Sequence, residues 1–201
     1  MTMTLEQANE AAKGMTFEKV WLYFQESKEE AQKQYEETQR QIRELSKIVE
    51  NQSKNINGIN DTIGKFSEAM FLPEIHERFK KFGYNFRSDS VIPNRTFVND
   101  NDQKIAEADI YLANETTAMI VEVKAKISQN DIDEHITRIN NIRNDFNNRN
   151  DRRKIIGTIA SPIIDPSLIT YAHNLGLFVL VQSGESVKIA DMPENFKPKT
   201  W

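Results

Sequence analysis

A hydrophobic stretch in the middle of the chain contains two charged residues that could do chemistry. Residues 118–125 read as a β-strand, and Glu122 and Lys124 interrupt its otherwise apolar run. Because side chains of a strand alternate between faces, Glu122 and Lys124 point the same way. A charge inside an apolar strand is costly unless it has a partner. The two residues therefore either pair with each other, as a structural ion pair, or belong to a polar site.

The preceding predicted strand adds two more acidic residues, Glu107 and Asp109. A hairpin loop with an even number of residues, centred on residues 114–115, would place Asp109 opposite Ile120. Glu107 would then lie opposite Glu122, and all the charged groups would share one face, whereas an odd loop would move Asp109 to the other face. Three carboxylates on one face repel one another, and a single lysine does not neutralise them. A hard divalent cation with oxygen ligands fits such a site.

This spacing resembles a known nuclease signature. Asp109, twelve intervening residues and then Glu122-Val123-Lys124 are similar to the PD-(D/E)XK pattern, with alanine in place of the pattern's proline. Many members of that superfamily have a further acidic ligand on an upstream helix, and Glu68 is its counterpart in this sequence.

The resemblance covers nearly the whole chain. The layout looks like an uncharacterised prokaryotic family that joins an N-terminal coiled coil to a restriction-endonuclease-like core. Besides the Asn- and Gly-rich end of the coil, the segments that carry this likeness are residues 131–135, 157–160, 171–172, 176–179, 182–184 and 195–201.

The resemblance implies metal-assisted hydrolysis of phosphodiester bonds, with Mg²⁺ or Mn²⁺ as the cofactor. Asp109, Glu122 and the backbone carbonyl of Val123 would bind the metal ion. Lys124 would orient or help to deprotonate the attacking water and stabilise charge on the phosphate. Glu68 would bind a second metal ion or a metal-bound water.

Further residues are candidates for supporting roles. Glu107 is either an auxiliary acid or an ion-pair partner. His135 lies one turn after Asp131 on the next predicted helix, where related nucleases place residues that touch the phosphate or the metal-bound water; the alternative is a structural histidine. Basic residues after the motif either contact the nucleic-acid backbone or form a solvated basic surface, and they are Lys126, Arg138, Arg143, Arg152 and Arg153.

The first third of the chain is predicted to be a helix that needs a partner. Mostly apolar residues recur at alternating spacings of three and four from Trp21 to Phe66. Such a heptad pattern indicates a coiled coil, so we expect a homo-oligomer, a dimer or larger, through residues 21–66. A helix that folds back onto its own domain is the alternative. Poor helix formers between residues 51 and 60 predict fraying or a bend there.

The remaining pattern defines the domains and the fold class. Residues 1–15 are expected to be flexible, residues 16–63 to form the coiled-coil helix, and residues 64–201 to form one nuclease-like domain. The expected elements are a helix over 61–82 broken at Pro73, an extended segment over 84–98, strands over 108–112 and 118–125, a helix from Ser128 to about Phe146, a strand over 155–160, a helix beginning at Asp165-Pro166, and strands over 177–182 and 187–190. This order predicts an α/β fold with a restriction-endonuclease-like mixed β-sheet flanked by helices.

Composition excludes several classes of protein. The chain has 201 residues and no cysteine, which rules out disulfides and thiolate metal sites. No apolar run approaches the roughly 20 residues of a membrane-spanning helix, and the first residues lack the features of a signal peptide, so we expect a cytoplasmic protein with no membrane partner. The formal net charge of −4 argues against binding to nucleic acid by bulk charge.

Two functions remain, and they belong to different classes. The first is a metal-dependent nuclease that acts as a coiled-coil oligomer on nucleic acid, with DNA favoured over RNA. The second is a non-catalytic nucleic-acid-binding or scaffold protein that uses the nuclease fold. The acidic net charge favours the second function, whereas the complete set of acidic residues beside Lys124 favours the enzyme.

Overall fold

The computed structural model describes residues 4–99, 101–184 and 186–201. The chain divides into two compact units, Met1–Gly58 and Ile59–Trp201. This boundary lies a few residues before the one expected between residues 63 and 64. All the predicted site residues belong to the second unit, so the geometry of the site can be described within it.

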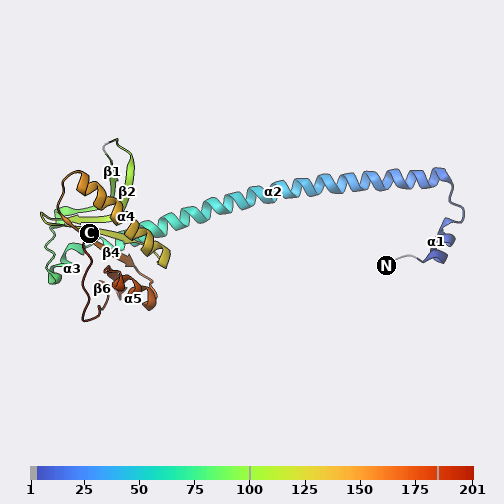
Figure 1. Cartoon of the computed structure of the whole chain (residues 1–201). Helices are drawn as coiled ribbons and strands as arrows, with labels where there is room; N and C mark the ends of the chain where they lie inside the picture. The colour runs from blue at the N-terminus through green and yellow to red at the C-terminus, as the bar shows by residue number, and fades with distance from the viewer. Residues whose placement is uncertain (1–3, 100, 185) are drawn as a thin grey trace. The chain divides into compact units, whose positions relative to one another are not determined.

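The first unit is helical. Helix α1, Leu5–Ala12, begins at a capping box in which the Thr4 side chain accepts a hydrogen bond from the backbone N–H of Gln7. Part of the segment that was expected to be flexible is therefore helical, and residues 1–3 of that segment lie outside the described residues. Helix α2, Phe17–Phe71, begins in this unit and ends in the second (Figure 1).

Helix α2 is unbroken over residues 51–60, so the predicted fraying there is wrong. Asparagine and glycine each lower helix stability by about 0.5–1 kcal/mol relative to alanine. Adding a residue to an existing helix needs no new nucleus, however, and turns on both sides of this segment are helical. Local propensity alone therefore does not end the helix.

The apolar stripe of α2 is exposed in the single chain. Ile42, for example, is 50% exposed, and other large side chains of the stripe are exposed as well. These include Trp21, Phe24, Tyr35, Leu45, Val49, Ile56, Ile59, Ile63 and Phe66. A long helix that presents such a stripe to water has no core of its own along most of its length.

The end of α2 and the region after it contain the predicted helix-terminating residues, a proline and a glycine. The helix ends at Phe71, just before Pro73, which has no N–H and cannot continue the hydrogen-bond ladder. Helix α3, Ile75–Arg78, and a 3₁₀ turn, Lys80–Phe82, follow. Gly83 then closes this region with a φ of 85°, a conformation that glycine adopts without steric strain. The predicted break and the predicted terminal glycine are both confirmed.

The second unit is built on a six-stranded mixed sheet with the strands in sequence order. The strands are β1 Val91–Val98, β2 Lys104–Ala113, β3 Thr117–Val123, β4 Lys154–Ser161, β5 Phe178–Ser183 and β6 Ser186–Ile189. Strands β1, β2 and β3 are antiparallel, β3, β4 and β5 are parallel, and β6 is antiparallel to β5. A 3₁₀ turn, Ser88–Ser90, precedes β1.

Two helices make the crossovers between the parallel strands. Helix α4, Gln129–Asn148, connects β3 to β4, and Ser128 caps it by accepting a hydrogen bond from the backbone N–H of Asp131. Helix α5, Pro166–Asn174, connects β4 to β5 and is capped by Asp165, with proline in its first turn. Both predicted caps are confirmed. Each cap side chain accepts a hydrogen bond from a backbone N–H group that has no partner within the helix.

The two faces of the sheet carry separate hydrophobic cores. Helix α4 packs on one face, where Ile132, Ile139 and Ile142 join Ile120 of β3. The end of α2 and helix α3 contribute to the core of the other face, where Phe71 joins Val121. The charged side chain of Glu122 therefore lies on the face that α4 covers, between two layers that would otherwise be apolar.

The β2–β3 hairpin has the predicted parity but a shifted register. Tyr111 lies opposite Ile120, and the backbone N–H of Asn114 donates to the carbonyl of Thr117. The loop is therefore the even, two-residue pair 115–116, and the predicted pairings of Asp109 with Ile120 and of Glu107 with Glu122 are wrong. The shift arises because the Asn114 side chain accepts hydrogen bonds from backbone N–H groups of the loop. Continuing the register by one residue pair places Asp109 opposite Glu122.

Candidate functional site

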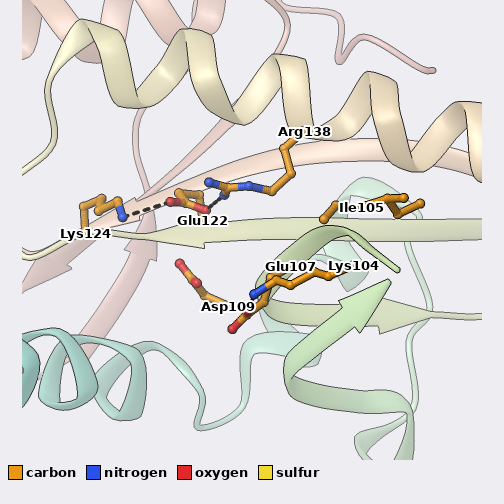
Figure 2. A pocket seen from close by; sticks show the side chains of 8 residues that line it. Lys104, Ile105, Glu107, Asp109, Glu122, Lys124 and Arg138 are labelled. Carbon is orange, nitrogen blue, oxygen red and sulfur yellow. Dashed lines mark hydrogen bonds and ion pairs between the residues drawn. The ribbon is translucent and has the colours of Figure 1, made fainter. Parts of the chain in front are cut away.

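Five of the predicted site residues line a cavity of about 510 Å³ on the α4 side of the β2–β3 hairpin (Figure 2), and they are Glu107, Asp109, Glu122, Lys124 and Arg138. Its lining consists of Lys104, Ile105, Ala106, Glu107, Asp109, Glu122, Lys124 and Arg138. The hairpin and the strand end supply most of these side chains, and Arg138 is the contribution of α4. The structure thus brings together Asp109, Glu122 and Lys124, as the even hairpin loop predicted.

Glu122 is the most buried charged residue of this cavity, with 2% of its surface exposed. The Nζ of Lys124 lies 3.2 Å from Glu122 Oε1, and the guanidinium of Arg138 binds Glu122 Oε2 (Figure 2). A buried carboxylate is strongly destabilising unless cations and hydrogen bonds compensate it. Here two cations provide that compensation, one from its own strand end and one from α4.

Asp109 faces Glu122 from the neighbouring strand. Its Oδ2 accepts a hydrogen bond from the backbone N–H of Val123 at 2.6 Å. Among the described residues, Oδ1 has no hydrogen-bond or ion-pair partner. Burial raises the pKa of Asp109, and the Val123 hydrogen bond and the charges of Lys124 and Arg138 only partly offset this effect. Asp109 is therefore a partly desolvated carboxylate with an oxygen available to a ligand.

Glu68 lies near the end of α2, within the electrostatic reach of the hairpin carboxylates. Its pKa is raised by burial first and by the charge of Asp109 second, and a side-chain hydrogen bond with Asn94 acts in the opposite direction. Asn94 adopts a φ of 50° within β1, in a region that asparagine tolerates better than most residues. Glu68 does not line the cavity, so it belongs to the surroundings of the site rather than to its wall.

Glu107 lines the cavity but already has a cationic partner. The Nζ of Lys104, three residues earlier on β2, forms an ion pair with its carboxylate. Of the two interpretations of Glu107, the structure therefore supports the one in which it is an ion-pair partner. The Lys104 side chain is exposed and that of Glu107 is partly exposed, so this pair contributes little to the stability of the fold.

His135 lies behind Glu122 rather than in the cavity. Its imidazole is fully buried, and Nδ1 is 4.0 Å from Glu122 Oε2. Burial lowers the pKa of His135 to about 4, although the carbonyl groups of Ile120 and Thr158 near the ring favour the protonated form. Neither ring nitrogen makes a hydrogen bond of normal geometry with any residue in the described part of the chain. His135 is a neutral packing residue beneath Glu122, and it does not border the space that a substrate would enter.

Two of the predicted nucleic-acid contacts are arginines that hold the loop after α4. Arg143 donates from Nη1 to the carbonyl of Arg153 at 2.6 Å and from Nη2 to the carbonyl of Asp151 at 2.5 Å. Arg153 forms an ion pair with Asp151 and lies over the ring of Phe146. These contacts fix the turn between α4 and β4, so their guanidinium groups have structural partners.

The other candidates differ in position. Lys126 and Arg152 are exposed, and Lys126 lies two residues after the lysine of the motif. Arg138 lines the cavity and contacts Glu122, a partnership that sequence reasoning missed. The signal was present, because Arg138 follows His135 by three residues and so lies on the same side of the helix, at the edge of its apolar stripe.

Asp109 and Glu122 are the residues of the cavity that could hold a hard divalent cation of the Mg²⁺ type. Magnesium in proteins retains several waters and is commonly held by one or two carboxylates together with substrate phosphates. Asp109 and Glu122 provide two such carboxylates on adjacent strands, and Asp109 Oδ1 has no partner among the residues that the structure describes. Within residues 4–99, 101–184 and 186–201, no three or more His, Asp or Glu side chains are grouped so that they could hold a metal ion. An ion held by these two carboxylates would therefore keep much of its water.

Comparisons with models of protein families, with curated proteins and with solved structures gave no match to this chain. Across the described residues, none of the helices combines the length and the apolar character that crossing a membrane requires. Functional inference for this chain accordingly depends on the chemistry of the cavity and on the resemblance of its motif.

Proposed function

We propose that the chain is a metal-dependent nuclease that hydrolyses phosphodiester bonds, with DNA as the favoured substrate. The observation that carries the proposal is the meeting of Asp109, Glu122 and Lys124 on one wall of an open cavity. These are the residues of the PD-(D/E)XK-like motif, and they come from two adjacent strands whose register sets Asp109 opposite Glu122.

Each residue of the motif has a role that its surroundings support. A bound Mg²⁺ or Mn²⁺ would polarise the phosphate and lower the pKa of a coordinated water. Asp109 and Glu122, with the carbonyl of Val123, would hold that ion, and Glu68 would orient water from the edge of the site. Lys124 is near enough to Glu122 to be positioned by it and exposed enough to reach a phosphate or the attacking water.

The proposal includes a finer fold assignment, because the order of elements resembles that of a restriction-endonuclease-like core. Supporting it are the helix before β1, the antiparallel β1–β2–β3 segment that carries the motif, and the α4 crossover to a parallel β4. The exposed stripe of α2 supports assembly of the nuclease as a homo-oligomer, because apolar side chains at heptad spacing bury one another when two such helices pair.

A non-catalytic nucleic-acid-binding or scaffold protein is the second candidate, and one observation favours it. Both oxygens of Glu122 already have cationic partners, Lys124 and Arg138. Arg138 neutralises charge that Lys124 alone would leave, so a divalent ion is less necessary than the sequence predicts. A protein that used this arrangement as an internal ion-pair network would bind partners without cutting them.

A cleavage assay separates the two candidates. Purified protein is incubated with plasmid, single-stranded and branched DNA, and RNA, in Mg²⁺ or Mn²⁺. We expect cleavage by the wild type and a loss of at least about 100-fold in Glu122→Ala and Lys124→Ala, since each removes several kcal/mol of transition-state stabilisation. Glu115→Gln, in the exposed loop of the same hairpin, is the matched control. Cleavage by both site variants at the wild-type rate would contradict the nuclease. So would the absence of cleavage of every substrate by the wild type.

A further inference from the structure

Glu122 lies between two cations that come from different elements. Lys124 follows it at the end of its own strand, whereas Arg138 reaches it from α4 (Figure 2). Lys124 engages Oε1 and Arg138 engages Oε2, so both oxygens of the buried carboxylate are occupied. A divalent ion that binds Glu122 must therefore displace or share one of these two contacts.

The contact with Arg138 is the one that can be exchanged. Its side chain is 26% exposed and lines the cavity, so it can rotate away from Glu122 without disturbing the core. Its ion pair with Glu122 uses Nη1, and the other guanidinium donors have no protein partner among the described residues. A planar guanidinium with free donors is well suited to bind a phosphate through two parallel hydrogen bonds.

The charges of the cavity show when such an exchange becomes favourable. The carboxylates of Asp109 and Glu122 and the cations Lys124 and Arg138 together are neutral. A divalent ion adds two positive charges beside Arg138, and repulsion then disfavours the guanidinium at Glu122. A phosphodiester brings a negative charge into the same space and gives Arg138 a new partner.

We propose that Arg138 binds a backbone phosphate of the nucleic acid, and that it leaves Glu122 for this phosphate when a divalent ion occupies the carboxylate. This inference rests on the proposed function, because it assigns a substrate contact to the same site. It makes the binding of metal and of nucleic acid cooperative, since each ligand favours the arrangement in which Arg138 has left Glu122. Arg138 would thus keep the buried carboxylate neutralised until both ligands arrive.

The test measures binding and does not depend on turnover. The affinity of the full chain for Mn²⁺ is measured by calorimetry without DNA, and its affinity for a short DNA duplex is measured with and without Ca²⁺, with the duplex checked for integrity afterwards. The variants are Arg138→Gln and Arg138→Lys. Arg152→Gln, an exposed arginine beyond the end of α4, controls for the loss of one positive charge.

We expect Arg138→Gln to bind Mn²⁺ about tenfold more tightly than the wild type, because a competing cation is gone. We also expect the stimulation of DNA binding by Ca²⁺, about tenfold in the wild type, to fall below about twofold. Arg152→Gln should weaken DNA binding without changing either quantity. Arg138→Lys keeps the charge but lacks the planar fork, so it should bind Mn²⁺ like the wild type and still lose most of the stimulation.

The outcomes separate this inference from the proposed function. A folded Arg138→Gln variant whose Mn²⁺ affinity and Ca²⁺ stimulation equal those of the wild type overturns the exchange, while cleavage by the wild type would leave the nuclease standing. Tighter Mn²⁺ binding with lost stimulation, in a protein that cuts nothing, supports the exchange and rejects the nuclease. If neither the wild type nor Arg138→Gln binds Mn²⁺, the exchange is overturned, and the cleavage assay alone decides whether the chain is a nuclease. If Arg138→Gln does not fold, wild-type stimulation in Arg138→Lys overturns the exchange.

Discussion

The carboxylate of Asp109 accepts a hydrogen bond of 2.6 Å from the backbone N–H of Val123, and this bond ties the aspartate to the strand that carries Glu122. The backbone donor is fixed by the sheet, so the carboxylate has little freedom to rotate. One oxygen is held in place and the other remains available on the cavity side. The arrangement positions Asp109 at Glu122 without a cation bound directly to it.

Replacing Asp109 by asparagine removes the negative charge of the side chain but keeps its size and shape. An asparagine oxygen can still accept the hydrogen bond from Val123, but the side chain no longer attracts a divalent ion. Nuclease activity in Asp109→Asn should fall by at least about 100-fold. The measurement is the initial rate of plasmid cleavage, with Glu115→Gln as the control that removes a carboxylate from the same hairpin.

The same substitution should not weaken the fold at neutral pH. Burial raises the pKa of Asp109 above its ordinary value of 3.8, which means that ionisation opposes folding. Stability from such a group is complete below the unfolded-state pKa and is lost as pH rises through the folded-state pKa. At pH 7, Asp109→Asn should therefore unfold at the same urea concentration as the wild type or a higher one, and any gain should shrink as the pH approaches 4. A clear loss of stability at pH 7 would contradict this assignment.

Removing Arg138 from the pair of Glu122 and Arg138 should lower the free energy of unfolding more than removing the charge of Glu122. Arg138→Met leaves a carboxylate that is 2% exposed with only Lys124 beside it, and we expect a loss of about 3 kcal/mol in the free energy of unfolding. Glu122→Gln leaves two cations that reach water, and we expect a loss of about 1 kcal/mol or less. Urea unfolding of both single variants and the double variant measures the difference. Equal losses would show that Glu122 is better solvated than its burial indicates.

His135 is expected to make the fold sensitive to mild acid. Burial lowers its pKa to about 4 in the folded chain, so between the ordinary value of 6.5 and 4 the unfolded chain binds a proton that the folded chain does not. Stability is then complete above pH 6.5 and is lost as pH falls through this window, by up to about 3 kcal/mol. The pKa of the partly buried His173 is lowered too, so the measurement is the difference between wild type and His135→Leu at pH 7.5, 6 and 5. A parallel decline of the two proteins would contradict a buried, neutral His135.

Much of the secondary structure could be predicted because its signals are local. The caps at Ser128 and Asp165, the break before Pro73 and the terminal Gly83 each depend on residues within one turn of the chain. The shared face of Asp109 and Glu122 followed from strand alternation and an even loop. Its exact register did not, because the side chain of Asn114 selects the loop, and several even loops satisfy the same hydrophobic pattern.

The contacts of the site that the sequence did not predict are those that depend on how α4 packs against the sheet. The sequence predicts that Arg138 and Arg143 either contact nucleic acid or form a solvated basic surface. In the structure, α4 lies across the sheet so that Arg138 reaches Glu122. Arg143 instead donates to carbonyl groups of the following loop. Helical spacing shows which residues share a side of α4, but it does not show where the helix lies over the sheet. That position depends on contacts between residues far apart in the chain.

The apolar stripe of α2 leads to a prediction about assembly. Ile42 and Val49 occupy the same heptad position in two successive heptads, and both are exposed in the single chain. Two glutamates at these positions would place like charges inside a paired interface and would cost about 1–3 kcal/mol each. We expect light scattering to give the mass of several chains for the wild type and of one chain for Ile42→Glu combined with Val49→Glu. Asn51→Glu combined with Asn57→Glu adds the same charge away from the stripe and should leave the mass unchanged. A wild type with the mass of one chain would rule out the oligomer, and equal loss in both double variants would place the cause in net charge instead of the stripe.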